Sequence, residues 1–130
     1  MTRIALLGAG RIGQVHARAV SSVQAAKLVA VADPVTKNAK LVQDQYDCDI
    51  RTINQILLSD DVDGVVICTP TDTHADLIER FAKAGKAIFC EKPVDLDISR
   101  VQACLTVVQD ENATLMVGFN RRYDPDFQAL

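Results

Sequence analysis

The stretch from Ile4 to Gly13, I-A-L-L-G-A-G-R-I-G, constrains the fold of this chain more than any other. Four apolar residues run directly into Gly8, Gly10 and Gly13, which is typical of a strand buried on both faces that leads through a tight turn into a helix. Gly8 allows the turn, Gly10 leaves room for a pyrophosphate at the backbone, and Gly13 lets the helix pack close to the strand.

The residues around these glycines meet the conditions that give the pattern meaning. A G-x-G-x-x-G motif alone is weak evidence, because many Gly-rich turns bind nothing. Here a strand pattern precedes it, a helical pattern follows, and Asp33 ends the next apolar run, 20 residues after Gly13. The amides of Arg11 and Ile12 at the start of the helix, together with the helix dipole, would bind phosphates. We therefore predict that this region binds a dinucleotide, with His16 as a packed or partly exposed helix residue rather than a ligand.

Asp33 bears on which dinucleotide binds. A carboxylate at this position accepts hydrogen bonds from both hydroxyls of the adenosine ribose and repels a 2′-phosphate, which favours NAD. Because it precedes Pro34, Asp33 has the alternative role of a turn or N-cap residue. Lys37 is close enough in sequence to favour a phosphate, so NADP stays open as the alternative cofactor.

Short apolar runs alternate with helical patterns along the whole chain. Strands are predicted at residues 3–7, 27–32, 48–51, 62–68, 86–90 and 114–119, and helices from residue 11 and over residues 36–46, 53–58, 75–84 and 97–110. This alternation predicts an α/β fold with a doubly wound, mostly parallel sheet of order 3-2-1-4-5-6, which is the Rossmann dinucleotide-binding domain. The spacing predicts one apolar face on the first helix and one on the last. The face of the first helix consists of Ile12, Val15, Ala19 and Val23, and that of the last consists of Ile98, Val101, Leu105 and Val108.

Two later strands are followed by polar segments, T-P-T-D-T-H and E-K-P. Ligands of open parallel sheets bind at the carboxyl ends of the strands, so both segments are predicted to lie at the binding crevice. Thr71 or Thr73 has the ordinary alternative role of a helix N-cap, and Lys92 that of a solvated surface lysine. The residues predicted there as cofactor contacts are Thr69, Pro70, Thr71, Glu91 and Lys92.

Composition excludes several classes of protein. The net charge of −3 and the lack of a basic run argue against nucleic acid as a partner, and no apolar stretch approaches the ~20 residues of a membrane span. The four cysteines are widely spaced and form no C-x-x-C pair, which argues against a metal site. They are read as reduced thiols of a cytoplasmic protein.

Four motifs occur in an order that resembles the glucose-fructose oxidoreductase and inositol dehydrogenase family. They are G-A-G-R-I-G-Q-V-H from Gly8, T-P-T-D-T-H from Thr69, A-G-K-A-I-F-C-E-K-P from Ala84, and G-F-N-R-R-Y-D-P from Gly118. The E-K-P motif is the most specific, and the last motif is most similar to that of the family's inositol 2-dehydrogenases. The resemblance implies a homo-oligomeric enzyme that uses NAD or NADP to oxidise a sugar or cyclitol hydroxyl, with myo-inositol as the expected substrate.

The resemblance also assigns roles to single residues. Lys92 is the implied catalytic lysine, near the nicotinamide and the reacting hydroxyl. Glu91 and Pro93 shape the nicotinamide side of the site, and the Lys92–Pro93 bond is often cis in relatives. Arg122 is implied to lie near the nicotinamide with Asn120 beside it. At Thr71, where relatives commonly carry Asn, the chain departs from the family pattern.

In this family a second α/β domain carries a catalytic Asp and His and the face through which subunits associate. The expected organisation is an NAD-binding domain over residues 1–119 and the start of that second domain over residues 120–130. Two alternatives stay open: a sensor module that binds NAD(H) without catalysis, and an NADP-linked sugar reductase of the same family.

Overall fold

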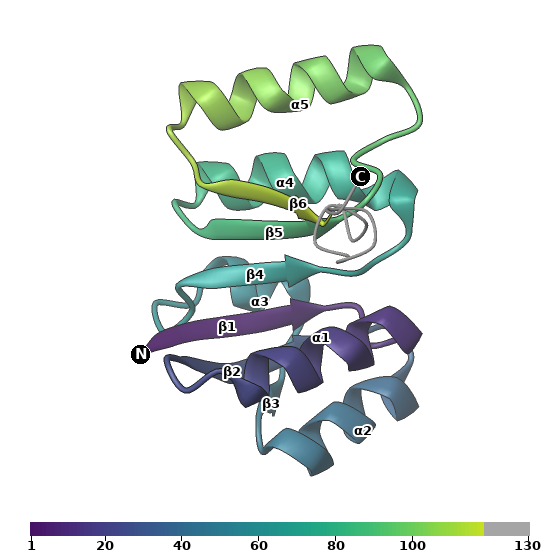
Figure 1. The fold of residues 1–130 in the computed structure, drawn as a ribbon, viewed down its shortest axis with the longest axis vertical. Helices are drawn as coiled ribbons and strands as arrows, with labels where there is room; N and C mark the ends of the chain where they lie inside the picture. Colours follow the sequence, from purple (N-terminus) through teal and green to yellow (C-terminus); the bar gives the residue numbers. More distant parts are fainter. Residues whose placement is uncertain (119–130) are drawn as a thin grey trace, which may run out of the picture.

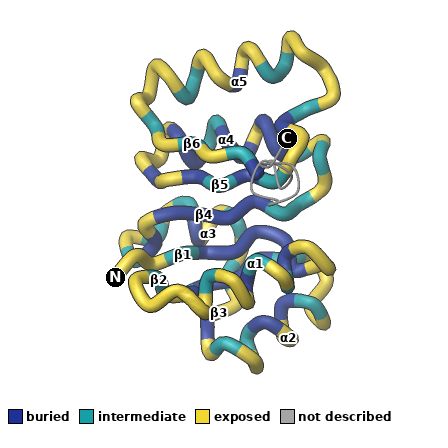
Figure 2. The backbone as a smooth tube through the Cα atoms, viewed as in Figure 1, coloured by how far each residue is buried: buried dark blue, intermediate teal, exposed yellow. Residues whose placement is uncertain are grey.

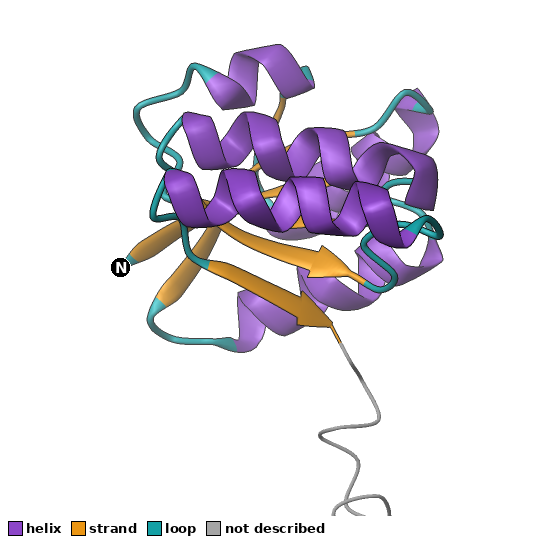
Figure 3. Ribbon diagram, turned by 90° about the horizontal axis from the view of Figure 1, so that it is seen from above, coloured by secondary structure: helices purple, strands orange, loops and turns teal. Residues whose placement is uncertain are grey.

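The computed structural model describes residues 1–118 as one six-stranded parallel sheet between two layers of helices (Figures 1 and 3). The strand order is β3-β2-β1-β4-β5-β6, which confirms the predicted doubly wound topology. The strands are β1 (Thr2–Leu7), β2 (Ala26–Ala32), β3 (Asp49–Ile50), β4 (Gly64–Ile67), β5 (Ala87–Glu91) and β6 (Leu115–Gly118). The α-helices are α1 (Arg11–Ser22), α2 (Thr36–Tyr46), α3 (Ile53–Leu57), α4 (His74–Lys83) and α5 (Ile98–Asp110), and a 3₁₀ turn, η1 (Thr71–Thr73), precedes α4.

Each face of the sheet has its own apolar core. Helices α3, α4 and α5 cover one face, where Ile56, Ile78 and Phe81 are fully buried against the strands. Helices α1 and α2 cover the other, around Leu6 and Val42. The central strands are buried from both sides, whereas the outer surface of α5 is exposed (Figure 2). This two-sided burial is why strands β1 and β4 are continuous apolar runs.

Helix α1 does not bury the apolar face that the spacing predicts. Ile12 and Val15 are 50% and 58% exposed, and the buried residues of the helix are Gly13 and Ala17. The reason is the approach of α1 to the strand: a Cβ on Gly13 would lie 2.0 Å from the Gly8 carbonyl oxygen. The smallest residues therefore face the sheet, and the larger apolar residues are turned outward.

Helix α5 departs from its predicted face in a similar way. Ile98 and Leu105 are exposed, and Cys104 is the buried residue of the helix, with Val101 and Val108 packed partly around it. The predicted start is confirmed, since Asp97 is the N-cap and accepts a hydrogen bond from the Ser99 amide. Gly85 ends α4 with φ +76°, as its predicted C-cap role requires.

Within residues 1–118, no helix is long and apolar enough to cross a membrane. The same residues contain no group of three His, Cys, Asp or Glu side chains able to hold a metal ion. All four cysteines are free, and Cys48, Cys90 and Cys104 are buried. Burial raises the pKa of the Cys68 and Cys90 thiols to about 12.

Candidate dinucleotide-binding site

The three glycines after β1 meet three different steric demands. Gly8 has φ +90°, and a Cβ there would lie 2.6 Å from the Cys68 carbonyl oxygen at the end of β4. Gly13 lies against the Gly8 carbonyl, as described above. Gly10 is exposed, and a Cβ there would meet no atom within 4 Å. Gly8 and Gly13 are thus required by the fold, and the space above Gly10 is open to a ligand.

The N-terminus of α1 lies beside this open space. The first backbone bond of the helix runs from the Gln14 amide to the Gly10 carbonyl, at 2.9 Å. Within the described chain, the amides of residues 10–13 have no hydrogen-bond acceptor, and the first turn carries no acidic residue. Arg11 and Ile12 are exposed. Free amides at the positive end of a helix dipole are suited to bind an anionic phosphate.

Asp33 connects the end of β2 to the glycine turn. Its Oδ2 accepts a hydrogen bond from the Ala9 amide at 2.7 Å, and its Oδ1 accepts one from the Val35 amide at 2.7 Å. The second bond is the turn role that the residue before Pro34 was expected to have. A carboxylate has about four lone-pair sites, so each oxygen can still accept another hydrogen bond, such as one from a ribose hydroxyl.

A cavity of about 580 Å³ opens next to Asp33. It lies at the carboxyl ends of β2, β3 and β4, and among residues 1–118 the predicted site residues in its lining are Asp33 and Thr69. Its volume suits an adenosine-sized group. The other residues around it are Ala32, Pro34, Ile50, Arg51, Thr52, Ile53, Asn54, Gln55 and Arg80.

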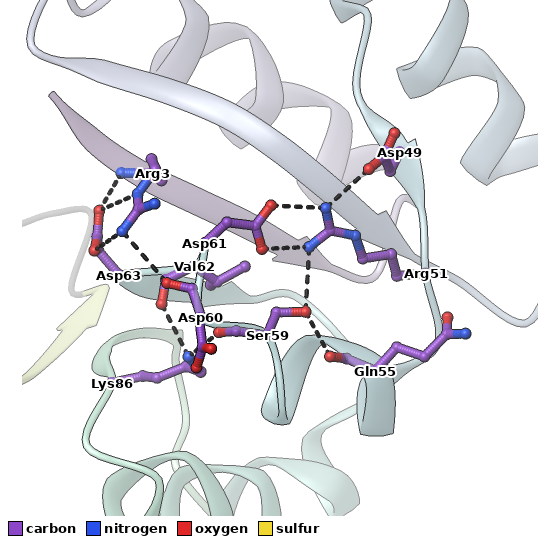
Figure 4. Close-up of polar contacts among 10 residues, drawn as sticks. All are labelled: Arg3, Asp49, Arg51, Gln55, Ser59, Asp60, Asp61, Val62, Asp63 and Lys86. Carbon is purple, nitrogen blue, oxygen red and sulfur yellow. Dashed lines mark hydrogen bonds and ion pairs between the residues drawn. The ribbon is translucent and has the colours of Figure 1, made fainter.

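A network of charges holds Arg51 in the cavity wall (Figure 4). Its guanidinium donates two bonds to the Asp61 carboxylate, at 2.7 and 2.8 Å, and one to Asp49 at 2.8 Å. The hydrogen bonds from Arg51 lower the pKa of Asp61. Two more basic side chains hold the loop that contains Asp61: Arg3 binds the Asp63 carboxylate, and the Lys86 ammonium donates to two main-chain carbonyls.

The sequence pattern did not single out the residues 50–55 that line this cavity. One signal could have found them: they directly follow β3, at the sheet edge where ligands of such folds bind. Residues 52–55 also form a capping box. The Thr52 hydroxyl accepts a hydrogen bond from the backbone amide of Gln55, and the Gln55 side chain accepts one from the backbone amide of Thr52.

The T-P-T segment follows β4, as predicted. The Thr69 hydroxyl is 2.5 Å from that of Thr73, which donates in turn to the Pro70 carbonyl at 2.6 Å. The alternative N-cap role is confirmed by position for Thr73, which is the N-cap residue of α4, but its side chain accepts no hydrogen bond from a helix amide. The hydroxyls of Thr69 and Thr73 instead bond within the turn before α4.

The E-K-P segment follows β5 and lies next to α1. The Glu91 carboxylate accepts a hydrogen bond from His16 Nε2 at 2.5 Å. The peptide bond between Lys92 and Pro93 is cis, as the resemblance implied. Lys92 is exposed, and no other residue of the described chain bonds its ammonium group. Asn120 and Arg122, the remaining predicted site residues, lie outside the described residues.

His74 joins the two segments. This side chain, at the first position of α4, is 2% exposed. Its Nε2 lies 2.7 Å from the Thr69 carbonyl oxygen, and its Nδ1 lies 2.8 Å from the Pro93 carbonyl oxygen. The loops after β4 and β5 are therefore connected through one buried ring. The predicted residues within 1–118 thus lie at the carboxyl ends of four neighbouring strands, β2, β1, β4 and β5.

Comparison with known proteins agrees with this geometry. Residues 2–119 match the model of an oxidoreductase family with an NAD-binding Rossmann fold. Over 128 residues the chain is 65% identical to the inositol 2-dehydrogenase of Rhizobium meliloti (strain 1021), a match that covers 98% of this chain and 39% of that protein.

Two crystal structures have the same fold. The myo-inositol dehydrogenase of Corynebacterium glutamicum ATCC 13032 is 43% identical, with a TM-score of 0.90, and the scyllo-inositol dehydrogenase of Lactobacillus casei is 28% identical, with a TM-score of 0.93. Each match covers 99% of this chain and 39% of the other, and the second structure contains NAD(H) and scyllo-inositol. The chain spans about two fifths of the length of the curated relatives it matches.

Proposed function

The chain belongs to the oxidoreductase family with an NAD-binding Rossmann fold, and we propose that it is the cofactor-binding part of an NAD-dependent inositol 2-dehydrogenase. The proposed substrate is a cyclitol, myo-inositol, of which one hydroxyl is oxidised to a ketone. One observation carries the proposal: the backbone at Gly10 is unobstructed, beside helix amides that have no acceptor among residues 1–118. The adjacent residue, Ala9, is bonded to the Asp33 carboxylate.

The residues present fit this cofactor. The amides of residues 10–13 would hold its pyrophosphate, since they lie at a helix N-terminus and no acceptor among residues 1–118 bonds them. Asp33 would accept from the adenosine ribose through the lone pairs that its two backbone bonds leave free. The cavity beside it would take the adenine, with Thr69 in its wall. Pro70 and Thr71, on the same turn, are proposed as further contacts.

The nicotinamide half of the cofactor is assigned to the E-K-P segment. Glu91 and Lys92 are proposed contacts there, and the family resemblance adds Asn120 and Arg122. When bound, NAD supplies the acceptor for the hydride that leaves the hydroxyl-bearing carbon. Lys92 donates a hydrogen bond to the reacting oxygen and stabilises the charge that develops there as its proton leaves. The proton itself is expected to go to the His of the second domain that the resemblance implies.

We also propose the organisation and setting of the whole protein. Residues 1–119 form the NAD-binding domain, and residue 120 begins the substrate domain through which subunits of a homo-oligomer associate. The end of the family match at residue 119 supports this boundary. A cytoplasmic location is supported by four cysteines that are all free.

Steady-state kinetics of the whole enzyme with the variant Lys92→Ala tests the proposal. We expect NAD-dependent oxidation of myo-inositol by the unmodified enzyme, and a turnover about 10²–10⁴-fold lower in the variant, the range for loss of a group that assists proton transfer. NAD affinity should be nearly unchanged. Lys83→Ala, on the exposed side of α4, is the matched control and should behave like the unmodified enzyme.

Two results would overturn this assignment. If Lys92→Ala keeps its normal turnover, the lysine is a surface residue and the role implied by the family fails. If the 130-residue chain alone oxidises myo-inositol, the complete catalytic set lies within it and no second domain is needed for chemistry.

A further inference from the structure

The chain contains two histidines, and both bond the E-K-P segment. His16, on α1, donates to the Glu91 carboxylate from one side of the sheet. His74, on α4, bonds the Pro93 carbonyl from the other side. The residue between Glu91 and Pro93 is Lys92. Lys92 therefore lies between two residues that are bonded by imidazole rings from opposite helix layers, Glu91 through its side chain and Pro93 through its main-chain carbonyl.

The segment has few other attachments. Residues 92–94 lie beyond the last residue of β5, and they form no backbone–backbone hydrogen bond with any other residue of the described chain. Lys92 and Pro93 are exposed, and Val94 is the next buried residue. Beyond β5, the His74 contact with the Pro93 carbonyl and the burial of Val94 hold the backbone that follows Lys92, while His16 holds the side-chain carboxylate of Glu91 before it.

The contact of His74 costs more to lose than that of an exposed side chain. Its ring is buried, and each nitrogen faces a carbonyl oxygen, a group that can only accept. A ring with hydrogen on both nitrogens donates to both oxygens at once, whereas a neutral ring has one N–H and donates to one of them. Removal of the ring would leave two carbonyl groups without their partner inside the protein.

Side chains from several elements surround the contact between His16 and Glu91. The His16 ring lies 5.1 Å from the Phe89 ring, centre to centre. A Cβ on Gly118, at the end of β6, would lie 2.9 Å from the Phe89 ring and 3.4 Å from Glu91 Oε1. The Glu91 carboxylate is thus confined between α1 and β6. His16 also lies on the helix whose N-terminus is the proposed phosphate site.

We propose that His16 and His74 are positioning residues that together fix Lys92 and Glu91 for the nicotinamide end of the cofactor. The inference rests on the proposed function, because it assigns this segment to the nicotinamide half of NAD. It predicts that the two histidines contribute to the affinity for the nicotinamide half of the cofactor. They do not contribute to the affinity for the adenosine diphosphate half, which binds at the glycine turn and Asp33.

Calorimetric titration of the 130-residue chain with NAD and with ADP-ribose separates the two halves, since ADP-ribose lacks the nicotinamide. In His16→Phe and His74→Asn we expect NAD affinity to fall about tenfold, the order of effect of one lost hydrogen bond, and ADP-ribose affinity to stay within about twofold. His16→Gln keeps a donor for Glu91 and should recover most of the loss. Ile78→Ala, buried on the same helix as His74, is the control: it should lower stability without changing the ratio of the two affinities.

The outcomes distinguish the inference from the proposed function. If the unmodified chain binds neither ligand, the proposed function fails and the inference falls with it. If it binds both ligands but the ratio is the same in the histidine variants, or if NAD and ADP-ribose bind equally well from the start, the dinucleotide site stands and the positioning role is refuted. Nitrogen-15 NMR adds a direct readout: we expect a hydrogen on His74 Nδ1, which faces the Pro93 carbonyl, and a ring without it would refute this contact.

Discussion

Replacing Gly10 and Gly13 one at a time should separate cofactor binding from stability. The two glycines are three residues apart in one motif, yet a Cβ on Gly10 meets nothing within 4 Å, whereas a Cβ on Gly13 meets the Gly8 carbonyl oxygen at 2.0 Å. Real Cβ contacts essentially never fall below 3.0 Å, so α1 would have to retreat by about 1 Å in Gly13→Ala. In Gly10→Val the fold has room for the new side chain, but that side chain occupies the space that a pyrophosphate needs.

The magnitudes follow from these contacts. Overpacking costs typically ~1–3 kcal/mol, and here the obstacle is backbone that cannot rotate away. Alanine gains about 1 kcal/mol over glycine within a helix, so Gly13→Ala should lower the free energy of unfolding by about 2 kcal/mol. Gly10 is an N-cap with extended backbone, where an apolar residue costs about 0.5–1 kcal/mol. If the side chain prevents two charge-assisted bonds to the pyrophosphate, NAD affinity falls about hundredfold or more.

Urea unfolding followed by circular dichroism gives the first quantity, and calorimetric titration with NAD gives the second. Gly10→Val should be folded and unable to bind, and Gly13→Ala should be destabilised. Normal NAD binding by folded Gly10→Val would mean that the phosphate site lies elsewhere. Unchanged stability of Gly13→Ala would mean that α1 does not pack against the turn as described.

Three further predictions concern charge and thiol chemistry. The chain should bind NAD more tightly than NADP, because the Asp33 carboxylate repels a 2′-phosphate; equal binding by calorimetry would make Asp33 a turn residue alone. Hydrogen bonds from Arg3 lower the pKa of Asp63 to about 2, below its value of 3.8 in the unfolded chain, so this pair stabilises the fold at neutral pH and the stabilisation is lost as the pH falls from about 4 to about 2. Asp63→Asn should flatten the loss of stability measured over that range, and an unchanged profile would contradict the role of the pair. Cys68 and Cys90, with pKa values raised to about 12, should resist alkylation at pH 8 until the chain is unfolded; rapid labelling of the native chain would refute the raised pKa values.

Local patterns in the sequence are sufficient for the fold class and for most of the candidate site. Alternating strand and helix patterns predict the sheet and its order, because each element needs an apolar face of characteristic period. The glycine spacing, Asp33 and the polar segments after two strands predict the crevice, because carboxyl ends of parallel strands share one edge of the sheet. The E-K-P motif is recognised only by its resemblance to a family, since a lone lysine after a strand is ordinary.

The tertiary structure decided what depends on contacts between distant residues. The face that α1 buries is set by the approach of Gly13 to Gly8, which overrides the apolar spacing of the helix. A register shift between β1 and β2 likewise places neighbouring residues 29 and 30 against the same core, which strict alternation would not predict. The roles of His16 and His74 arise from partners 75 and 19 residues away. Hydrophobic periodicity cannot predict such contacts, because it indicates only which side of an element is apolar and not which side chain will lie opposite it.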